Sequence, residues 1–135
     1  MLEPVKGQGR VLVMDDEEMV RGVLGRMLDH LGYEADFAGD GSQALEKFAE
    51  AKEAGRPFAA VILDLTIPGG MGGKEALEKL LKIDPHVKAI ASSGYSDAPI
   101  MAGFKKYGFS EVIGKPYRVS ELSKILIGVI GDHPV

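Results

Sequence analysis

The chain alternates short apolar runs with longer segments whose apolar residues recur at helical spacing. The short runs predict β-strands at 10–14, 33–37, 59–64, 87–94 and 111–116. The longer segments predict helices at 17–32, 42–55, 74–83, 96–108 and 118–131. Strict alternation of strands and helices predicts a parallel sheet with helices on both faces. The expected fold class is therefore α/β, as one doubly wound domain.

The composition of each strand indicates its place in the five-stranded sheet. The strands at 10–14, 59–64 and 87–94 are almost continuously apolar, which is typical of interior parallel strands. The strand at 33–37 alternates apolar and polar residues and the last strand is short, so we expect both at the edges. The flavodoxin-like order 2-1-3-4-5 meets these demands with right-handed crossovers.

Each helix carries an apolar stripe that we expect to face the sheet. In the first helix the stripe consists of Met19, Val20, Val23, Leu24, Met27, Leu28 and Leu31. Met19 and Met27 lie on it, so both are expected in the core. His30, His86 and His133 have no metal-ligand spacing with one another and are expected at the surface.

Composition narrows the class of protein. The 135 residues, 45% hydrophobic and 27% charged, suit one ordered domain at 10–131, with a lead-in or linker at 1–9 and a tail at 132–135. A net charge of −4 argues against nucleic acid as the main partner. The absence of cysteine excludes disulfides and thiolate zinc sites and is compatible with the cytoplasm. No apolar run is long enough to span a membrane.

Polar residues follow the strands at the points where they end. Asp15 and Asp16 follow the first strand, Asp64 ends the third, Ser93 comes at the end of the fourth and Lys115 at the end of the fifth. The carboxyl ends of parallel strands meet at one edge of the sheet, where ligands bind. We therefore expect three carboxylates in one pocket, with a hydroxyl group and an ammonium group on its far side.

Three carboxylates this close cannot all stay ionised without positive charge. Lys115 supplies one positive charge and a divalent cation would supply two; oxygen ligands favour Mg²⁺ or Mn²⁺. A carboxylate beside such an ion can act as a nucleophile and form an aspartyl phosphate. Taken singly the residues have ordinary roles as well: Asp16 could cap the first helix and Lys115 could be a solvated lysine.

Four segments, VLVMDDEE, VILDLTIPGGMGG, AIASSGYSD and VIGKPY, occur in the order and spacing of a known family. Together they resemble the receiver domain of bacterial two-component response regulators, over roughly residues 9 to 130. The resemblance implies that Asp64 takes a phosphoryl group from a phosphohistidine on a sensor histidine kinase or histidine phosphotransfer domain. Such a domain catalyses only its own phosphorylation and dephosphorylation, so it is not an enzyme in the usual sense.

The resemblance also implies a set of metal ligands. Asp16 and Asp64 would contact Mg²⁺ directly, and Asp15 would lie nearby, often acting through water. The backbone carbonyl of Thr66 would be a further ligand.

Further roles follow from the same resemblance. Lys115 would bind a phosphoryl oxygen, its bond to Pro116 would be cis, and Ser93 would swing toward the phosphoryl group. Val112 stands where many receivers have an aromatic residue that turns inward. Valine has no ring to turn, so the resemblance does not imply the usual coupling between phosphorylation and the output surface. Tyr95 is a hypothetical substitute, or a shield against water.

The segments DLTIPGGMGG and SSGYSDAPIM resemble the receivers of hybrid histidine kinases. The alternative is a free-standing response regulator. Neither version would contact nucleic acid or membrane directly, and a weak homodimer is compatible with both.

Rival interpretations rest on weaker patterns. The segment 39–44, GDGSQA, fits a dinucleotide fingerprint with Asp64 about 20 residues further on, but it follows an edge strand, so a tight turn is expected. The segment PGGMGGK has Glu75 where a P-loop needs Ser or Thr. A metal-dependent phosphatase would share the nucleophile, metal and lysine but would need a second acid where Thr66 stands. A vestigial interaction module would not need the full set of acids.

Overall fold

The computed structural model describes residues 9–94 and 102–131. In this part of the chain, five parallel strands form one sheet in the order β2-β1-β3-β4-β5. The strands are β1 (Arg10–Met14), β2 (Glu34–Ala38), β3 (Ala60–Asp64), β4 (Ala89–Ser93) and β5 (Glu111–Gly114). The predicted order, and the predicted edge positions of the second and fifth strands, are confirmed.

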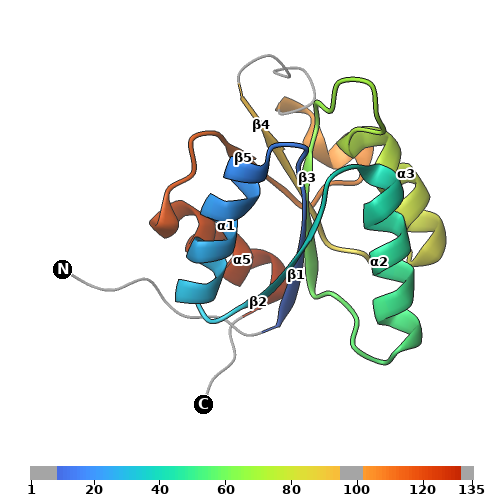
Figure 1. Cartoon of the computed structure of the whole chain (residues 1–135), viewed down its shortest axis with the longest axis horizontal. Helices are drawn as coiled ribbons and strands as arrows, with labels where there is room; N and C mark the ends of the chain where they lie inside the picture. Colours follow the sequence, from blue (N-terminus) through green and yellow to red (C-terminus); the bar gives the residue numbers. More distant parts are fainter. Residues whose placement is uncertain (1–8, 95–101, 132–135) are drawn as a thin grey trace.

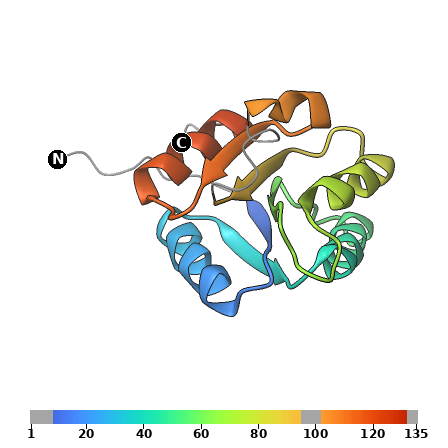
Figure 2. The ribbon, with the colours of Figure 1, turned by 90° about the horizontal axis from the view of Figure 1, so that it is seen from above.

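Helices cover both faces of the sheet. They are α1 (Glu18–His30), α2 (Gly41–Glu53), α3 (Gly73–Ile83) and α5 (Val119–Ile130). Helices α1 and α5 lie on one face, and α2 and α3 lie on the other (Figure 1). The view along the strands shows the sheet between these two layers (Figure 2). These four helices confirm the corresponding predictions, with ends that differ by one or two residues.

The segment predicted as the fourth helix, 96–108, is only partly within the described residues. Its described portion begins with an α-helical residue, Ala102, and continues into a short 3₁₀ helix, η1 (Phe104–Tyr107), so the prediction is tested only over its second half. Gly103 precedes this turn and Gly108, with φ of +99°, ends it, so only four residues lie between two poor helix formers. Tyr95, His133, and all of 1–8 and 132–135 lie outside the described residues, so what the sequence predicts for them stays a prediction.

The core consists of two layers, one on each face of the sheet. Alternate residues of a strand point to opposite faces. Leu12 and Leu63 therefore pack with α2 and α3, whereas Val13 and Ile62 pack with α1 and α5. The strands β1, β3 and β4 are buried on both faces, which explains their almost continuous apolar sequences.

One prediction about α1 is wrong, and the alternative role of Asp16 as its cap is not found. Met19 lies in the first turn of α1 and is 81% exposed. Met27, two turns further on, does pack against the core. Asp16 does not cap the helix: Glu17 occupies the N-cap position, and the Asp15 carboxylate accepts the Glu17 N–H at 2.9 Å.

The surface position predicted for His30 and His86 is confirmed, since both are exposed. None of the helices in the described part of the chain has the length and apolar character that crossing a membrane would require.

Candidate functional site

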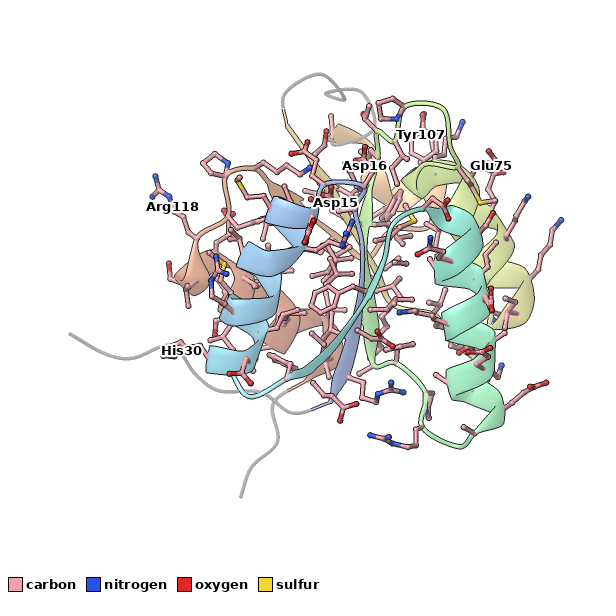
Figure 3. The ribbon with its side chains drawn as sticks, viewed as in Figure 1. Asp15, Asp16, His30, Glu75, Tyr107 and Arg118 are labelled. Carbon is pink, nitrogen blue, oxygen red and sulfur yellow. The ribbon has the colours of Figure 1, made fainter. Side chains whose placement is uncertain are left out.

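Two buried acids lie side by side at the carboxyl edge of the sheet. Asp15 directly follows β1 and Asp64 is the last residue of β3, and these strands pair in parallel with Met14 opposite Leu63. The exposed fractions of Asp15 and Asp64 are only 1% and 4%. Asp15 and Asp16 both sit at this upper edge of the sheet (Figure 3). Tertiary structure has thus brought together acids that are far apart in the sequence.

Lys115 joins the two buried acids. Its Nζ atom lies 3.0 Å from Asp15 Oδ2 and 3.6 Å from Asp64 Oδ1. The Lys115 backbone N–H donates to the Ser93 carbonyl at 2.9 Å, which fixes the start of the turn after β5 against the end of β4. The predicted meeting of acids and ammonium group is therefore present in the geometry.

A carboxylate cluster extends from Asp15 toward solvent. Asp15, Asp16 and Glu17 each offer an oxygen atom within 4.8 Å of the others, and only Asp15 is buried. The predicted ligand set did not include Glu17, although the run of four acids contained the signal. Asp64 is not part of this three-residue cluster, and Lys115 links it to Asp15.

The donor set fits a hard divalent cation. Asp15 Oδ2 is buried and lies 3.0 Å from the Lys115 ammonium group. With Asp16 and Asp64 ionised as well, three negative charges face one positive charge, and the remaining −2 equals the charge that Mg²⁺ would neutralise. All these donors are oxygen atoms, which Mg²⁺ and Mn²⁺ prefer.

Thr66 contacts Asp64 through its backbone. Its backbone N–H donates a long hydrogen bond, 3.4 Å, to Asp64 Oδ1. This contact places Thr66 beside the phosphoacceptor candidate. Ligation of a metal by its carbonyl oxygen stays a prediction.

The local environment changes the acidity of the site. Burial, together with the negative charge of Asp15, raises the pKa of Asp64 to about 6, although Lys115 and the Thr66 N–H act against the rise. For Lys115, burial lowers the pKa, but the hydrogen bond to Asp15 and the charges of Asp64 and Asp15 outweigh it and raise the pKa above its ordinary value. Lys115 therefore stays charged, while Asp64 titrates close to neutral pH.

The end of β4 borders this site. Ser93 is buried at the last position of the strand. Its neighbour Ser92 forms a hydrogen bond with the Tyr117 hydroxyl, a pair that was not foreseen from the sequence because the partners are 25 residues apart. The Lys115–Pro116 peptide bond is cis, as the resemblance implied.

Val112 stands at the position for which the resemblance implied an aromatic residue in many receivers. Val112 is half-buried in the core layer beneath α2 and α3, where Phe104 and Tyr107 also pack. Tyr95, the hypothetical substitute for that aromatic residue, lies outside the described residues.

Glycines hold the neighbouring loops in close contact. A Cβ atom on Gly41 would lie 2.5 Å from Met71 Sδ, and the Gly41 N–H donates to the Met71 carbonyl at 3.2 Å. Asp40 caps α2 by accepting the Gln43 N–H at 3.0 Å. The glycines of GDGSQA are thus explained by a tight turn and close packing, as expected. Likewise, a Cβ on Gly73 would lie 2.9 Å from the Asp64 carbonyl oxygen.

A groove of about 380 Å³ opens beside the site and is almost entirely apolar. We call it the apolar groove; its principal lining residues are Met19, Val20, Val23, Lys115, Pro116 and Tyr117. Met19 is the exposed large apolar side chain found in the described residues. The groove and the acidic site share Lys115, so they are adjacent.

Comparison with known proteins gives a consistent picture. The response regulator receiver domain family matches residues 11–127. The chain is 33% identical over 118 residues to the chemotaxis protein CheY of Thermotoga maritima, covering 87% of this chain and 93% of that protein. It is 31% identical over 113 residues to sporulation initiation phosphotransferase F of Bacillus subtilis, covering 84% and 86%. The structure of a receiver domain protein from Clostridium thermocellum superposes with a TM-score of 0.81 at 27% identity, covering 90% of this chain and 94% of that one.

The family match spans most of the chain, and the fold and the acidic edge of the sheet agree with it. The chain belongs to the response regulator receiver domain family and is a receiver domain of two-component signalling.

Proposed function

We propose that Asp64 is the phosphoacceptor of this receiver domain and takes its phosphoryl group from a phosphohistidine on a sensor histidine kinase or histidine phosphotransfer domain. One observation carries the proposal. The Lys115 ammonium group lies 3.0 Å from Asp15 and 3.6 Å from Asp64, with both carboxylates buried. A phosphoryl group on Asp64 would lie within reach of this ammonium group, which would offset its negative charge.

Asp15, Asp16 and Asp64, with the Thr66 carbonyl, would hold Mg²⁺ or Mn²⁺. When bound, the ion offsets negative charge on the phosphoryl oxygens. Support comes from the buried Asp15 carboxylate and from the excess of negative charge around Lys115.

The chain's own residues would carry out the transfer. An ionised oxygen of Asp64 attacks phosphorus, and the bond between phosphorus and the imidazole nitrogen breaks, leaving its electron pair on the nitrogen. Because the Asp64 pKa is about 6, this carboxylate is largely ionised above neutral pH. Lys115 binds a phosphoryl oxygen, and Ser93, at the end of β4, turns its hydroxyl toward the new group.

The apolar groove is the proposed docking surface for the phosphodonor. A donor must bring its histidine to Asp64, and the groove shares Lys115 with that site. Met19 is exposed there beside Val20 and Pro116, an arrangement that favours an apolar helix face on the partner.

We further propose that the domain comes from a hybrid histidine kinase and works in the cytoplasm. The proposal rests on the resemblance of DLTIPGGMGG and SSGYSDAPIM to such receivers. A free-standing response regulator is the alternative. The gene sequence on either side of this chain distinguishes the two.

Acetyl phosphate with Mg²⁺ tests the chemistry without a partner. Intact-mass measurement should show the gain of one phosphoryl group on the wild type and none on Asp64→Asn. The control Asp84→Asn removes a carboxylate outside the site and should become phosphorylated like the wild type. Phosphorylation of Asp64→Asn at the wild-type rate, or steady turnover of small phosphate esters, would contradict the proposal.

A further inference from the structure

A buried hydroxyl pair joins the end of β4 to the turn between β5 and α5. Ser92 Oγ and the Tyr117 hydroxyl oxygen share a hydrogen bond in which either group can donate. Ser92 is fully buried, and Tyr117 is half-buried against the core layer of α1 and α5. Because a buried hydroxyl without a partner is costly, each of these groups satisfies the other. Neither belongs to the phosphoryl chemistry proposed above.

Ser92 occupies the strand position next to the candidate phosphoacceptor. The register of β3 and β4 pairs Asp64 with Ser92, and the Leu65 N–H donates to the Ser92 carbonyl at 3.0 Å. Register neighbours in a parallel sheet project their side chains from the same face. A group bonded to the Ser92 hydroxyl is therefore fixed relative to Asp64.

Tyr117 lies at the far end of the turn that carries Lys115. At the near end, the Lys115 N–H is held by the Ser93 carbonyl at 2.9 Å. Pro116 has no N–H to donate. Arg118, the N-cap of α5, makes no side-chain capping bond and points away from the acids (Figure 3). The Tyr117 hydroxyl thus supplies a side-chain link between this turn and β4.

We propose that Tyr117 is a positioning residue for phosphoryl transfer: its bond to Ser92 holds the turn after β5 so that the Lys115 ammonium group stays directed at Asp64. The inference rests on the proposed phosphoacceptor role of Asp64. Lys115 Nζ lies 3.6 Å from Asp64 Oδ1. A lysine on a looser turn occupies more positions and spends less time against a phosphoryl oxygen.

The protonation state of Tyr117 agrees with this role. Burial raises the pKa of its phenol above the ordinary value, despite the hydrogen bond to Ser92 and the positive charge of Lys115. The phenol therefore keeps its proton at neutral pH, and the hydroxyl pair is intact where the domain works.

The test separates binding of a phosphoryl mimic from binding of metal. Tyr117→Phe removes the hydroxyl and keeps the ring that packs in the core. Calorimetry measures beryllofluoride binding with Mg²⁺ in excess and, separately, the binding of Mg²⁺ alone. We expect beryllofluoride binding to weaken about three- to tenfold, the range for one hydrogen bond, with the Mg²⁺ affinity unchanged within about twofold. General loosening of the fold would weaken both.

A matched control removes a different tyrosine hydroxyl. Tyr107, on η1, lies on the other face of the sheet and has Lys74 Nζ 5.2 Å from its ring centroid. Tyr107→Phe keeps this ring and should bind Mg²⁺ and beryllofluoride like the wild type.

A second background tests whether Tyr117 acts through Lys115. In Lys115→Met no ammonium group remains to be positioned, so adding Tyr117→Phe should cause no further loss of beryllofluoride affinity. The same three- to tenfold loss in that background would overturn the proposal.

The double variant Ser92→Ala/Tyr117→Phe removes both hydroxyls of the pair, so neither is buried without the other, and it covers the case in which Tyr117→Phe folds poorly. It should show the same loss of beryllofluoride affinity as Tyr117→Phe. Wild-type affinity in both variants would overturn the role of Tyr117 alone. A wild type that binds Mg²⁺ but no beryllofluoride would instead overturn the proposed function, and this inference with it.

Discussion

Lys115 Nζ and Asp15 Oδ2 lie 3.0 Å apart at the buried end of β1, and the same ammonium group is 3.6 Å from Asp64. One cation thus faces two buried anions. The charge left over is negative, which makes the stability of the domain depend on pH, on this lysine and on divalent metal.

The charge state of Asp64 should make the stability of the metal-free domain depend on pH. Its pKa is raised to about 6 in the folded state, chiefly by burial, and is about 3.9 in an unfolded chain. The folded state therefore binds the proton more tightly. This stabilisation is fully present below about pH 4 and is lost as the pH rises through about 6, at a cost of up to about 3 kcal/mol.

The variant Asp64→Asn has no charge to bury and should escape this loss. Urea unfolding with a chelator, at about pH 4 and about pH 8, gives the change in the free energy of unfolding. The gain of Asp64→Asn over the wild type should grow with pH by up to about 3 kcal/mol. The exposed control Asp29→Asn should follow the wild type. A constant difference between wild type and Asp64→Asn would contradict the raised pKa.

Removal of the Lys115 charge should make the fold depend on metal. Lys115→Met keeps the aliphatic stem but leaves Asp15 and Asp64 without their ammonium partner. Because the lysine side chain is 24% exposed, we expect a loss of about 2 kcal/mol without metal, below the 3–5 kcal/mol of fully buried pairs. Excess Mg²⁺ should restore more stability in this variant than in the wild type. Equal Mg²⁺ effects in thermal unfolding of the two proteins would argue against a metal site at Asp15 and Asp64.

Gly41 should not tolerate a methyl group, because a Cβ there would lie 2.5 Å from Met71 Sδ. We expect Gly41→Ala to lower the free energy of unfolding by about 1–3 kcal/mol through overpacking. The double variant Gly41→Ala/Met71→Ala removes the clash and should recover part of this loss. In contrast, Gly128 lies in α5 with open space around it, so Gly128→Ala should stabilise by about 0.5–1 kcal/mol. Equal effects of the two glycine substitutions would show that packing at Met71 is unimportant.

Met19 should contribute to docking of the phosphodonor protein and not to the phosphorylation reaction at Asp64. Met19→Gln keeps the length of the side chain and makes it polar, and at 81% exposure it should leave the stability nearly unchanged. We expect phosphotransfer from a phosphohistidine donor to slow by about fivefold or more, as for loss of an interface contact. Labelling by acetyl phosphate should stay at the wild-type rate. Arg26→Gln, at an exposed position of α1 outside the groove, serves as the control. Equal slowing with both donors would contradict a docking role.

The sequence by itself determined the architecture of this protein and the chemical groups at one edge of its sheet. The unbroken apolar runs of β1, β3 and β4 indicated interior strands, and the alternation with helices implied their parallel direction. Residues that follow parallel strands must meet at one edge, so Asp15, Asp64 and Lys115 could be placed together from their positions alone.

Only the tertiary structure decided the matters that depend on where an element ends and on which side chains meet across the sheet. Helical spacing places Met19 on the apolar stripe of α1, but only the fold shows that this side chain is solvated. Glu17 joins the acid cluster because the backbone turns after Asp15. The Ser92–Tyr117 bond and the contact of Gly41 with Met71 link residues distant in the sequence, and no local pattern specifies such pairs. The raised pKa of Asp64 has the same origin, since burial and neighbouring charge exist only once the chain has folded.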